Sequence, residues 1–302
     1  MPFVRSLDRR IVDALNKLSS EQGNWWRTLV EDPRVFIAVR RNELNAYFGG
    51  ASLGRIAWKN GALSFRVHVE YLVFADRERK DMYFDFLQES EFPRSVIVKD
   101  TKGYAKHFRD VKALAKEVAG SDERAGVNDI AFRNKCVLDI EAAFNTLREP
   151  KDPGIKPEPV GGRIDLVAVD QQCQLVFTEA KLFANDDLRL DPFPPVCSQL
   201  ISYHRWLERC RAEIQQAYTC LIANCRLLGR FFTRWDSLRD KSLTVDPIPR
   251  LLIFDCAKRD KAEVDQIGER IVEEVSRRIP GFGPQHIRCQ ERATQVRASD
   301  IL

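Results

Sequence analysis

The feature that most constrains the fold of this chain is a pair of apolar runs separated by a short polar turn. Residues 162–169 and 175–181 are rich in β-branched and other apolar side chains, and residues 170–173 form the break between them. Two such runs around a polar turn are typical of a β-hairpin. We therefore expect two neighbouring antiparallel strands here, within a largely apolar sheet.

Charged side chains stand at one end of this predicted hairpin. Asp165 lies near the start of the first run, and Glu179 and Lys181 lie at the end of the second. With the loop centred near Gln172, Asp165 lies opposite either Thr178 or Glu179. Only the second register pairs the two acids directly, and in the first a β-bulge would still bring them together. Glu179 and Lys181 share a face because strand side chains alternate. Such charges do not stabilise an apolar sheet, so they indicate a metal-dependent hydrolytic site.

Residues of these types suit the hydrolysis of a phosphodiester bond. Carboxylates bind a divalent cation, which activates water and neutralises charge, and a lysine adds a fixed positive charge. Oxygen ligands favour Mg²⁺ or Mn²⁺, so Asp165 and Glu179 are predicted ligands and Lys181 the predicted fixed charge. Other acid-x-Lys triplets do not end an apolar strand that pairs with an aspartate-bearing strand; they begin at Asp100, Asp110 and Glu149.

Two predicted helices flank the hairpin along the chain. Apolar spacing predicts one helix over residues 128–148, which carries Glu141 on its inward side. It predicts another over residues 196–214, which carries Gln199 and Tyr203. Residues four apart lie on one side of a helix, so Gln199 and Tyr203 should point together.

This order of elements resembles the core of the PD-(D/E)XK nuclease superfamily: an acidic helix, a strand with Asp165, a strand ending in Glu-x-Lys and a further helix. The Gln-x-x-x-Tyr spacing resembles the RecB-like branch of that superfamily. The resemblance covers about residues 125–225. Ile164 stands where the family often has proline, but that proline is frequently missing, so this departure does not count against activity.

The resemblance implies a restriction-endonuclease-like core, which is an α/β fold with a mixed central sheet flanked by helices. It implies a metal site for Mg²⁺ or Mn²⁺ with the ligands Glu141, Asp165 and Glu179. It also implies a set of catalytic residues, namely Asp165, Glu179, Lys181, Gln199 and Tyr203. Gln199 and Tyr203 would flank the metal and help to position the metal, the lysine or DNA.

Residues 1–115 predict a separate α+β domain, for which no family is recognised. Residues 5–19 have helical apolar spacing and precede a predicted antiparallel meander, with strands over residues 35–39, 44–48, 55–59 and 63–74. Residues 76–126 are charged and helical in character, and the domain boundary is placed within them, near residue 115. We expect this domain to position the substrate, to dimerise or to sense a partner.

One turn of this meander has a particularly clear signal. Asn60 and Gly61 tolerate positive φ at both central positions of a type I′ turn, which is the turn that suits a two-residue hairpin. Closing the hairpin there pairs Trp58 with Leu63. The sequence therefore predicts the register of this hairpin as well as its existence.

Residues 116–302 predict the α/β domain that contains the candidate site. Chain breakers at residues 152–154 and 157–162 precede the hairpin. Further strands are predicted over residues 217–223 and 250–255, and a last helix over residues 262–278. The expected architecture is therefore a mixed central sheet with helices on its faces.

The composition limits the class of protein. The 302-residue chain has 44% hydrophobic and 30% charged residues, which is typical of a globular protein. A net charge of +4 permits a polyanionic partner without requiring one. Neither a membrane-spanning run nor an apolar signal core is recognisable, so a cytoplasmic protein without a membrane partner is expected. The eight cysteines and four histidines lack the spacing of a zinc site.

The expected function is that of a Mg²⁺-dependent nuclease that hydrolyses DNA phosphodiester bonds, an endonuclease in particular. Two alternatives stay open, namely a nuclease of the same chemistry that cleaves RNA, and a non-catalytic module on the same core that serves in nucleic-acid binding or in assembly. DNA is favoured over RNA as the partner. The sequence also allows a homo-oligomer or a regulatory protein partner. No phosphate-binding loop with the Gly-x-x-x-x-Gly-Lys-Ser/Thr pattern occurs, so the chain has no ATP-driven motor of its own.

Overall fold

The computed structural model describes residues 3–72, 83–87, 98, 100–119, 121–147, 160–228, 235–238, 240–257 and 260–302. The chain divides into two compact units, which we call the mixed-sheet unit (Met1–Val4, Arg133–Thr219 and Asp240–Leu302) and the meander unit (Arg5–Phe132 and Cys220–Arg239). The division between the two large segments thus falls after residue 132, later than the predicted boundary at residue 115. A second segment of the chain, residues 220–239, also belongs to the meander unit.

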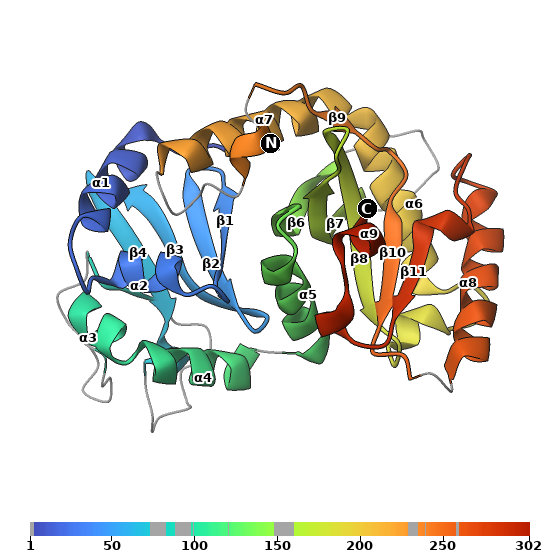
Figure 1. The fold of residues 1–302 in the computed structure, drawn as a ribbon, viewed down its shortest axis with the longest axis horizontal. Helices are drawn as coiled ribbons and strands as arrows, with labels where there is room; N and C mark the ends of the chain where they lie inside the picture. The colour runs from blue at the N-terminus through green and yellow to red at the C-terminus, as the bar shows by residue number, and fades with distance from the viewer. Residues whose placement is uncertain are drawn as a thin grey trace, which may run out of the picture. The chain divides into compact units, whose positions relative to one another are not determined.

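The meander unit contains an antiparallel five-stranded sheet in the order β1-β2-β3-β4-β5, as Figure 1 shows for its larger strands. Its strands are β1 (Phe36–Arg40), β2 (Glu43–Phe48), β3 (Ala51–Lys59), β4 (Ala62–His68) and β5 (Tyr83–Asp85). Asn60 and Gly61 have φ values of 48° and 81°, and Trp58 pairs with Leu63. The predicted turn and register are therefore confirmed. The last predicted strand, residues 63–74, is too long: β4 ends at His68 and a short 3-10 helix, η1 (Val69–Tyr71), follows it, while residues 73–74 lie outside the described residues.

Among the described residues up to Arg133, the α-helices are α1 (Arg9–Ser19), α2 (Trp25–Glu31), α3 (Thr101–Lys106), α4 (Phe108–Ala119) and α5 (Asp122–Arg133). The Asp8 side chain caps α1 by accepting a hydrogen bond from Arg10 N, and Ile11 and Leu15 are fully buried. The predicted N-terminal helix is thus confirmed. In α4, the buried Lys112 pairs with Asp32, so not every lysine of this charged region faces solvent.

The mixed-sheet unit contains a six-stranded sheet in the order β11-β10-β8-β7-β6, with β9 pairing to β8. Strands β6, β7 and β8 are antiparallel to one another, whereas β8, β10 and β11 are parallel. The strands are β6 (Val137–Leu147), β7 (Val160–Val169), β8 (Gln174–Leu182), β9 (Thr244–Val245), β10 (Arg250–Phe254) and β11 (Ile287–Gln290). The predicted hairpin is β7 and β8, and the predicted mixed sheet is observed.

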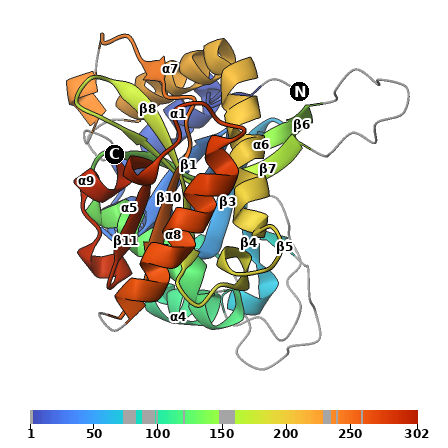
Figure 2. The ribbon, with the colours of Figure 1, turned by 90° about the vertical axis from the view of Figure 1, so that its right-hand side faces the viewer.

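Helices cover both faces of this sheet. They are α6 (Pro195–Arg209), the first part of α7 (Arg211–Leu227), whose residues 211–219 belong to this unit, α8 (Lys261–Ser276) and α9 (Ala298–Ile301). On one face, Leu251 and Ile253 of β10 pack with α6 and α8 in a buried apolar core. On the other face, the Thr178 hydroxyl donates a hydrogen bond to the Ile301 carbonyl of α9. Figure 1 shows α8 and α9 on opposite sides of β10 and β11, and Figure 2 shows α8 lying across these strands.

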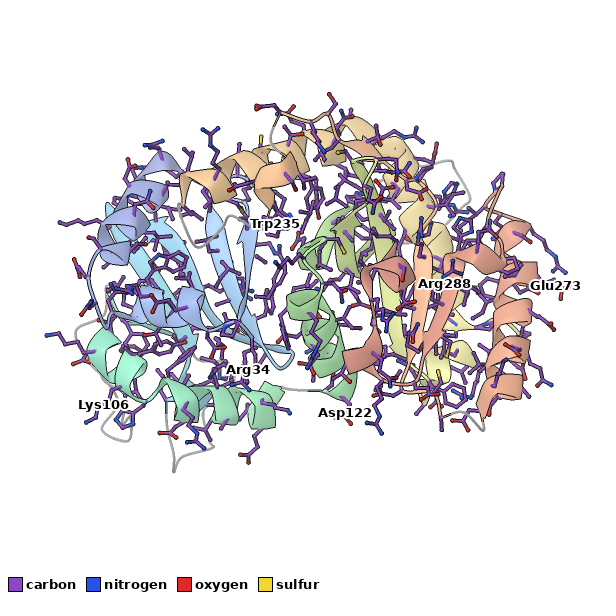
Figure 3. The ribbon with its side chains drawn as sticks, viewed as in Figure 1. Arg34, Lys106, Asp122, Trp235, Glu273 and Arg288 are labelled. Atoms are coloured by element: carbon purple, nitrogen blue, oxygen red, sulfur yellow. The ribbon has the colours of Figure 1, made fainter. Side chains whose placement is uncertain are left out.

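Helix α8 shows how the sequence selects the face that packs on the sheet. Val264, Ile267, Ile271 and Val275 are buried and follow helical spacing. On the outer side, Glu273 projects away from the sheet (Figure 3) and pairs with Arg277 at 2.5 Å. The helix predicted over residues 262–278 is therefore confirmed.

Two predicted elements are wrong. Residues 128–148 were expected to be one helix, but α5 ends at Arg133 and residues 137–147 form β6, so Glu141 lies on a strand. Residues 217–223 were expected to be a strand, but they lie within α7. The predicted helix over residues 196–214 ends at Arg209, and α7 begins two residues later.

The breakers predicted at residues 152–154 and most of those at 157–162 lie outside the described residues. In the part of the chain that the structure describes, no helix is both long and apolar enough to cross a membrane. The observed architecture is thus a mixed α/β unit and a unit built on an antiparallel sheet.

Candidate functional site

Asp165 and Glu179 stand level with each other on β7 and β8. The last regular pair between these strands on this side is Leu166 with Thr178. One residue further along each antiparallel strand places Asp165 beside Glu179. There the Asp165 Oδ2 atom accepts a hydrogen bond from Ala180 N at 2.9 Å. The register that the sequence left open is therefore the one that brings the two acids together.

Glu141 lies on β6 at the same level as Asp165. The residues on either side of Glu141 pair with the residues on either side of Asp165. Glu141 has a φ of 51°, in the left-handed region that non-glycine residues rarely adopt. Its Oε2 atom lies 2.5 Å from Nη1 of Arg163, a residue of β7. Three adjacent strands thus each contribute one acid to a single row across the sheet.

The pKa of Asp165 reflects this crowding. Burial raises it well above the usual range, and the negative charge of Glu179 raises it further. The hydrogen bond from Ala180 N and the charge of Lys181 act in the opposite direction, and Glu141 adds to the increase. The three acids are therefore close enough to repel one another, and a cation placed among them would relieve that repulsion.

Lys181 brings a positive charge to the row. Its side chain is buried, and its Nζ atom lies 2.8 Å from Glu179 Oε1. The same Nζ atom lies 3.6 Å from Oδ2 of Asp187 in the short helix η2 (Asp186–Leu188), which follows β8. A buried ammonium is costly unless its partners are well placed. Lys181 is accordingly held in one position between two carboxylates.

Tyr203 of α6 covers Glu179. Its hydroxyl lies 3.0 Å from Glu179 Oε2 and 2.9 Å from the Arg163 carbonyl oxygen. Burial raises the pKa of Tyr203, and repulsion from Glu179 and then Asp165 raises it further, so the hydroxyl stays protonated and donates. A Cβ atom on Gly162 would lie 2.9 Å from the Tyr203 ring. Glycine at that position therefore allows the ring to approach β7.

Gln199 lies one turn before Tyr203 on the same side of α6. Its Oε1 atom is buried, and within the described residues it has no hydrogen-bond partner. A buried acceptor without a donor is uncommon in proteins. The structure thus brings Glu179, Lys181 and Tyr203 into contact and places Asp165 near them, and it leaves Gln199 with an acceptor atom to be satisfied.

Sequence reasoning missed two residues that contact this site, Arg163 and Asp187. Arg163 could have been found, because it precedes Asp165 by two residues and strand alternation places both on one face. Asp187 follows a loop whose path the sequence does not reveal. That loop is held by Arg270, which donates hydrogen bonds to the carbonyl oxygens of Arg189 and Leu190 at 3.2 and 3.1 Å.

The predicted metal ligands are not arranged as a ready-made metal centre. Across the described ranges, no group of three or more His, Cys, Asp or Glu side chains is placed so that it could hold a metal ion. Glu141 is engaged by Arg163, and Glu179 is engaged by Lys181 and Tyr203. The donor atoms are nevertheless all carboxylate oxygens, which is the chemistry that Mg²⁺ and Mn²⁺ prefer. The metal-binding role of Glu141, Asp165 and Glu179 stays a prediction.

No protein-family model, no curated protein and no solved structure matches the chain. The resemblance to PD-(D/E)XK nucleases therefore stays a prediction that rests on the motifs and on the contacts described above.

Proposed function

We propose that the chain is a Mg²⁺- or Mn²⁺-dependent nuclease with a restriction-endonuclease-like core, which hydrolyses phosphodiester bonds in DNA. The observation that carries this proposal is the row of Glu141, Asp165 and Glu179 across three adjacent strands, beside the buried Lys181. A row of repelling acids does not stabilise a fold, so the proposal gives these residues a chemical role.

The residues fit a divalent cation in their chemistry. Asp165 and Glu179 would hold it, and Glu141 would join them after its carboxylate leaves Arg163. The raised pKa of Asp165 supports this, because a cation would relieve the repulsion that raises it. The buried Gln199 Oε1 also lacks a donor in the described residues, so Gln199 would be able to accept a hydrogen bond from a water in the loaded site. When bound, the cation supplies activation of a water and neutralisation of charge on the phosphate.

The protein's own residues would do the remaining work. Lys181 keeps a positive charge at Glu179 Oε1, where it would stabilise the developing negative charge on phosphate. Tyr203 holds the other oxygen of Glu179 and so fixes the orientation of that carboxylate. Arg163 has an exposed side chain (55%), and once it releases Glu141 it would pair with a phosphate oxygen of the substrate.

The test is a cleavage assay with purified protein. Linear duplex DNA, single-stranded DNA and RNA are incubated separately with Mg²⁺, with Mn²⁺ or with a chelator. Metal-dependent cleavage that Asp165→Asn abolishes is the expected result, and Asp85→Asn serves as a matched control because Asp85 is a buried acid of the other unit. Cleavage that survives Asp165→Asn would show that the active site is not the one assigned. Cleavage of RNA alone would show that the substrate is RNA and not DNA.

One observation favours a second function, namely a non-catalytic module that binds nucleic acid. Arg163 neutralises Glu141, and no three-ligand metal group is assembled in the described residues. Such a module would bind DNA or RNA equally well with a chelator present and would cleave neither in any metal. Binding without cleavage would therefore favour this alternative over the nuclease.

A further inference from the structure

Two cysteines stand together at one end of the mixed sheet. Cys289 lies on β11, where it pairs with Ile253 of the parallel strand β10. Cys256 follows β10 by two residues, after Asp255 turns the chain with a φ of 61°. The backbone N–H of Cys256 then donates a hydrogen bond to the Gln290 carbonyl oxygen at 3.3 Å. This turn brings Cys256 back against β11, beside Cys289.

The two thiols contact each other and open onto a cavity. The Cys256 thiol is hydrogen-bonded to Cys289. Cys256 is buried and Cys289 is exposed, so one thiol is sheltered and the other is accessible. Both line a cavity of about 890 Å³, whose other lining residues include Lys261, Asp265 and Arg297. The accessible thiol therefore has room in front of it for a small reactant.

The hydrogen bond makes the two thiols chemically unequal. It lowers the pKa of Cys289, although burial and the charges of Asp265 and Asp260 act against this. The same hydrogen bond raises the pKa of Cys256, and burial raises it further. Cys289 is thus the thiol that ionises more readily, and the thiolate is the nucleophilic form of cysteine. Cys210, by contrast, has a pKa raised by burial and has no such partner described.

We propose that Cys256 and Cys289 form a reactive thiol pair, which hydroperoxides oxidise to a disulfide. The Cys289 thiolate attacks the O–O bond, takes one oxygen as a sulfenic acid and releases the rest as an alcohol or as water. The Cys256 thiol then attacks the Cys289 sulfur, an S–S bond forms, and the sulfenic oxygen leaves as water. Two thiols and one hydroperoxide thus give one disulfide, one alcohol (water for hydrogen peroxide) and one water, and a thiol reductant reverses the bond.

The strand pairing shows where in the mixed sheet the disulfide would form. Cys289 is level with Ile253, and Ile253 is level with Lys181 of β8. Two strand spacings separate Cys289 from Lys181, which is about 10 Å. A disulfide would therefore form at the edge strand β11, at the level of Lys181, with β10 between it and the strand that carries Glu179 and Lys181. The inference itself does not depend on nuclease activity, because it rests on the contact between the two thiols and on their cavity.

The experiment follows thiol chemistry in the full chain. The protein is reduced, freed of reductant and treated with one to a few equivalents of hydrogen peroxide. Remaining thiols are alkylated, and peptides are identified by mass spectrometry. We expect a cross-linked peptide that joins Cys256 and Cys289, reversed by dithiothreitol, to form about tenfold faster than oxidation at Cys210.

Three variants make the assignment specific. Cys289→Ser should abolish the rapid reaction, and Cys256→Ser should leave a sulfenic acid at Cys289 that dimedone traps. Cys210→Ser is the matched control, since Cys210 is also partly accessible, and it should leave the cross-link unchanged. Oxidation of Cys289 no faster than that of Cys210 would overturn the proposal. So would oxidation of Cys289 in the unsubstituted protein to sulfinic acid without the cross-link.

Discussion

Two aspartates, the buried Asp85 of the meander unit and the partly buried Asp165 of the mixed-sheet unit, differ in what surrounds them. In the meander unit, the Asp85 carboxylate accepts hydrogen bonds from the Ser64 hydroxyl at 2.5 Å and from the backbone N–H groups of Phe65 and Leu87 at 3.1 and 3.2 Å. In the mixed-sheet unit, the Asp165 carboxylate accepts a hydrogen bond from Ala180 N and is level with two other acids.

The difference separates a structural acid from a chemical one. Asp85 is compensated by donors that join β4, β5 and the turn that follows β5, so its charge helps to hold the sheet together. Asp165 is opposed by its neighbours, which raise its pKa and destabilise its charged form. We expect substitution of Asp85 to affect folding and substitution of Asp165 to affect chemistry.

The largest expected effect is the loss of cleavage in Asp165→Asn. Removing a metal ligand should lower kcat/KM by on the order of 10³-fold or more, because water activation and charge neutralisation are lost together. The unfolding free energy in the absence of metal should stay the same or increase, because the repulsion with Glu179 is removed. Single-turnover cleavage measures the loss of activity, and urea unfolding measures the unfolding free energy. A variant that loses stability and keeps its activity would show that Asp165 has a structural role and not a chemical one.

Asp85→Asn should show the opposite behaviour. An amide cannot satisfy the same set of donors, and hydrogen bonds to charged groups contribute more than neutral ones, so unfolding free energy should fall by about 2–3 kcal/mol. Cleavage per folded molecule should be unchanged. Urea denaturation gives the first quantity, and activity measured well below the unfolding transition gives the second. Loss of cleavage in the folded variant would mean that Asp85 is not purely structural.

The pH dependence of stability tests the same contrast without a nuclease assay. The folded-state pKa of Asp165 lies above its unfolded value of about 3.9, so the native state binds more protons than the unfolded state between these two values. In chelator, this residue should therefore make unfolding free energy fall as the pH rises from about 4 towards the raised pKa. Asp165→Asn should remove that part of the slope. Urea titrations of both proteins across this range measure it, and equal slopes would contradict the raised pKa.

The sequence predicted the hairpin and most of its charged end because that information is local. A polar turn between two apolar runs identifies β7 and β8, and alternation places Glu179 and Lys181 on one face. The register beside Asp165 could not be read in this way. It depends on a side-chain carboxylate that accepts the Ala180 N–H where the regular ladder ends.

Glu141 is a predicted site residue for which the predicted type of element was wrong. In residues 137–147, Val137, Ile140 and Phe144 recur at helical spacing, which favoured a helix. Leu138 and Asp139 between them are also fully buried, so both faces of this segment are covered and the apolar pattern loses its strand period. Only pairing with β7, a tertiary contact, distinguishes the two structures.

The opposite error occurred in α7. Residues 217–223 combine aromatic, β-branched and apolar side chains, which favoured a strand. In the helix, Ile214, Tyr218, Leu221 and Cys225 are buried with helical spacing. A window wider than the apolar run would have revealed this period, because the buried positions extend beyond it at both ends.

The smallest expected effect concerns Asp187, which shares Lys181 with Glu179. Asp187→Asn should lower kcat by about tenfold, the scale typical of residues that orient a functional group, while the KM for DNA and the Mg²⁺ dependence change little. The reason is that Lys181 Nζ loses a carboxylate 3.6 Å away and gains freedom to move from its position at Glu179. Asp186→Asn is the matched control, because Asp186 is its exposed neighbour in the same short helix. Asp187→Glu should restore much of the lost kcat, and equal rates for Asp187→Asn and Asp186→Asn would show that Glu179 alone positions the lysine.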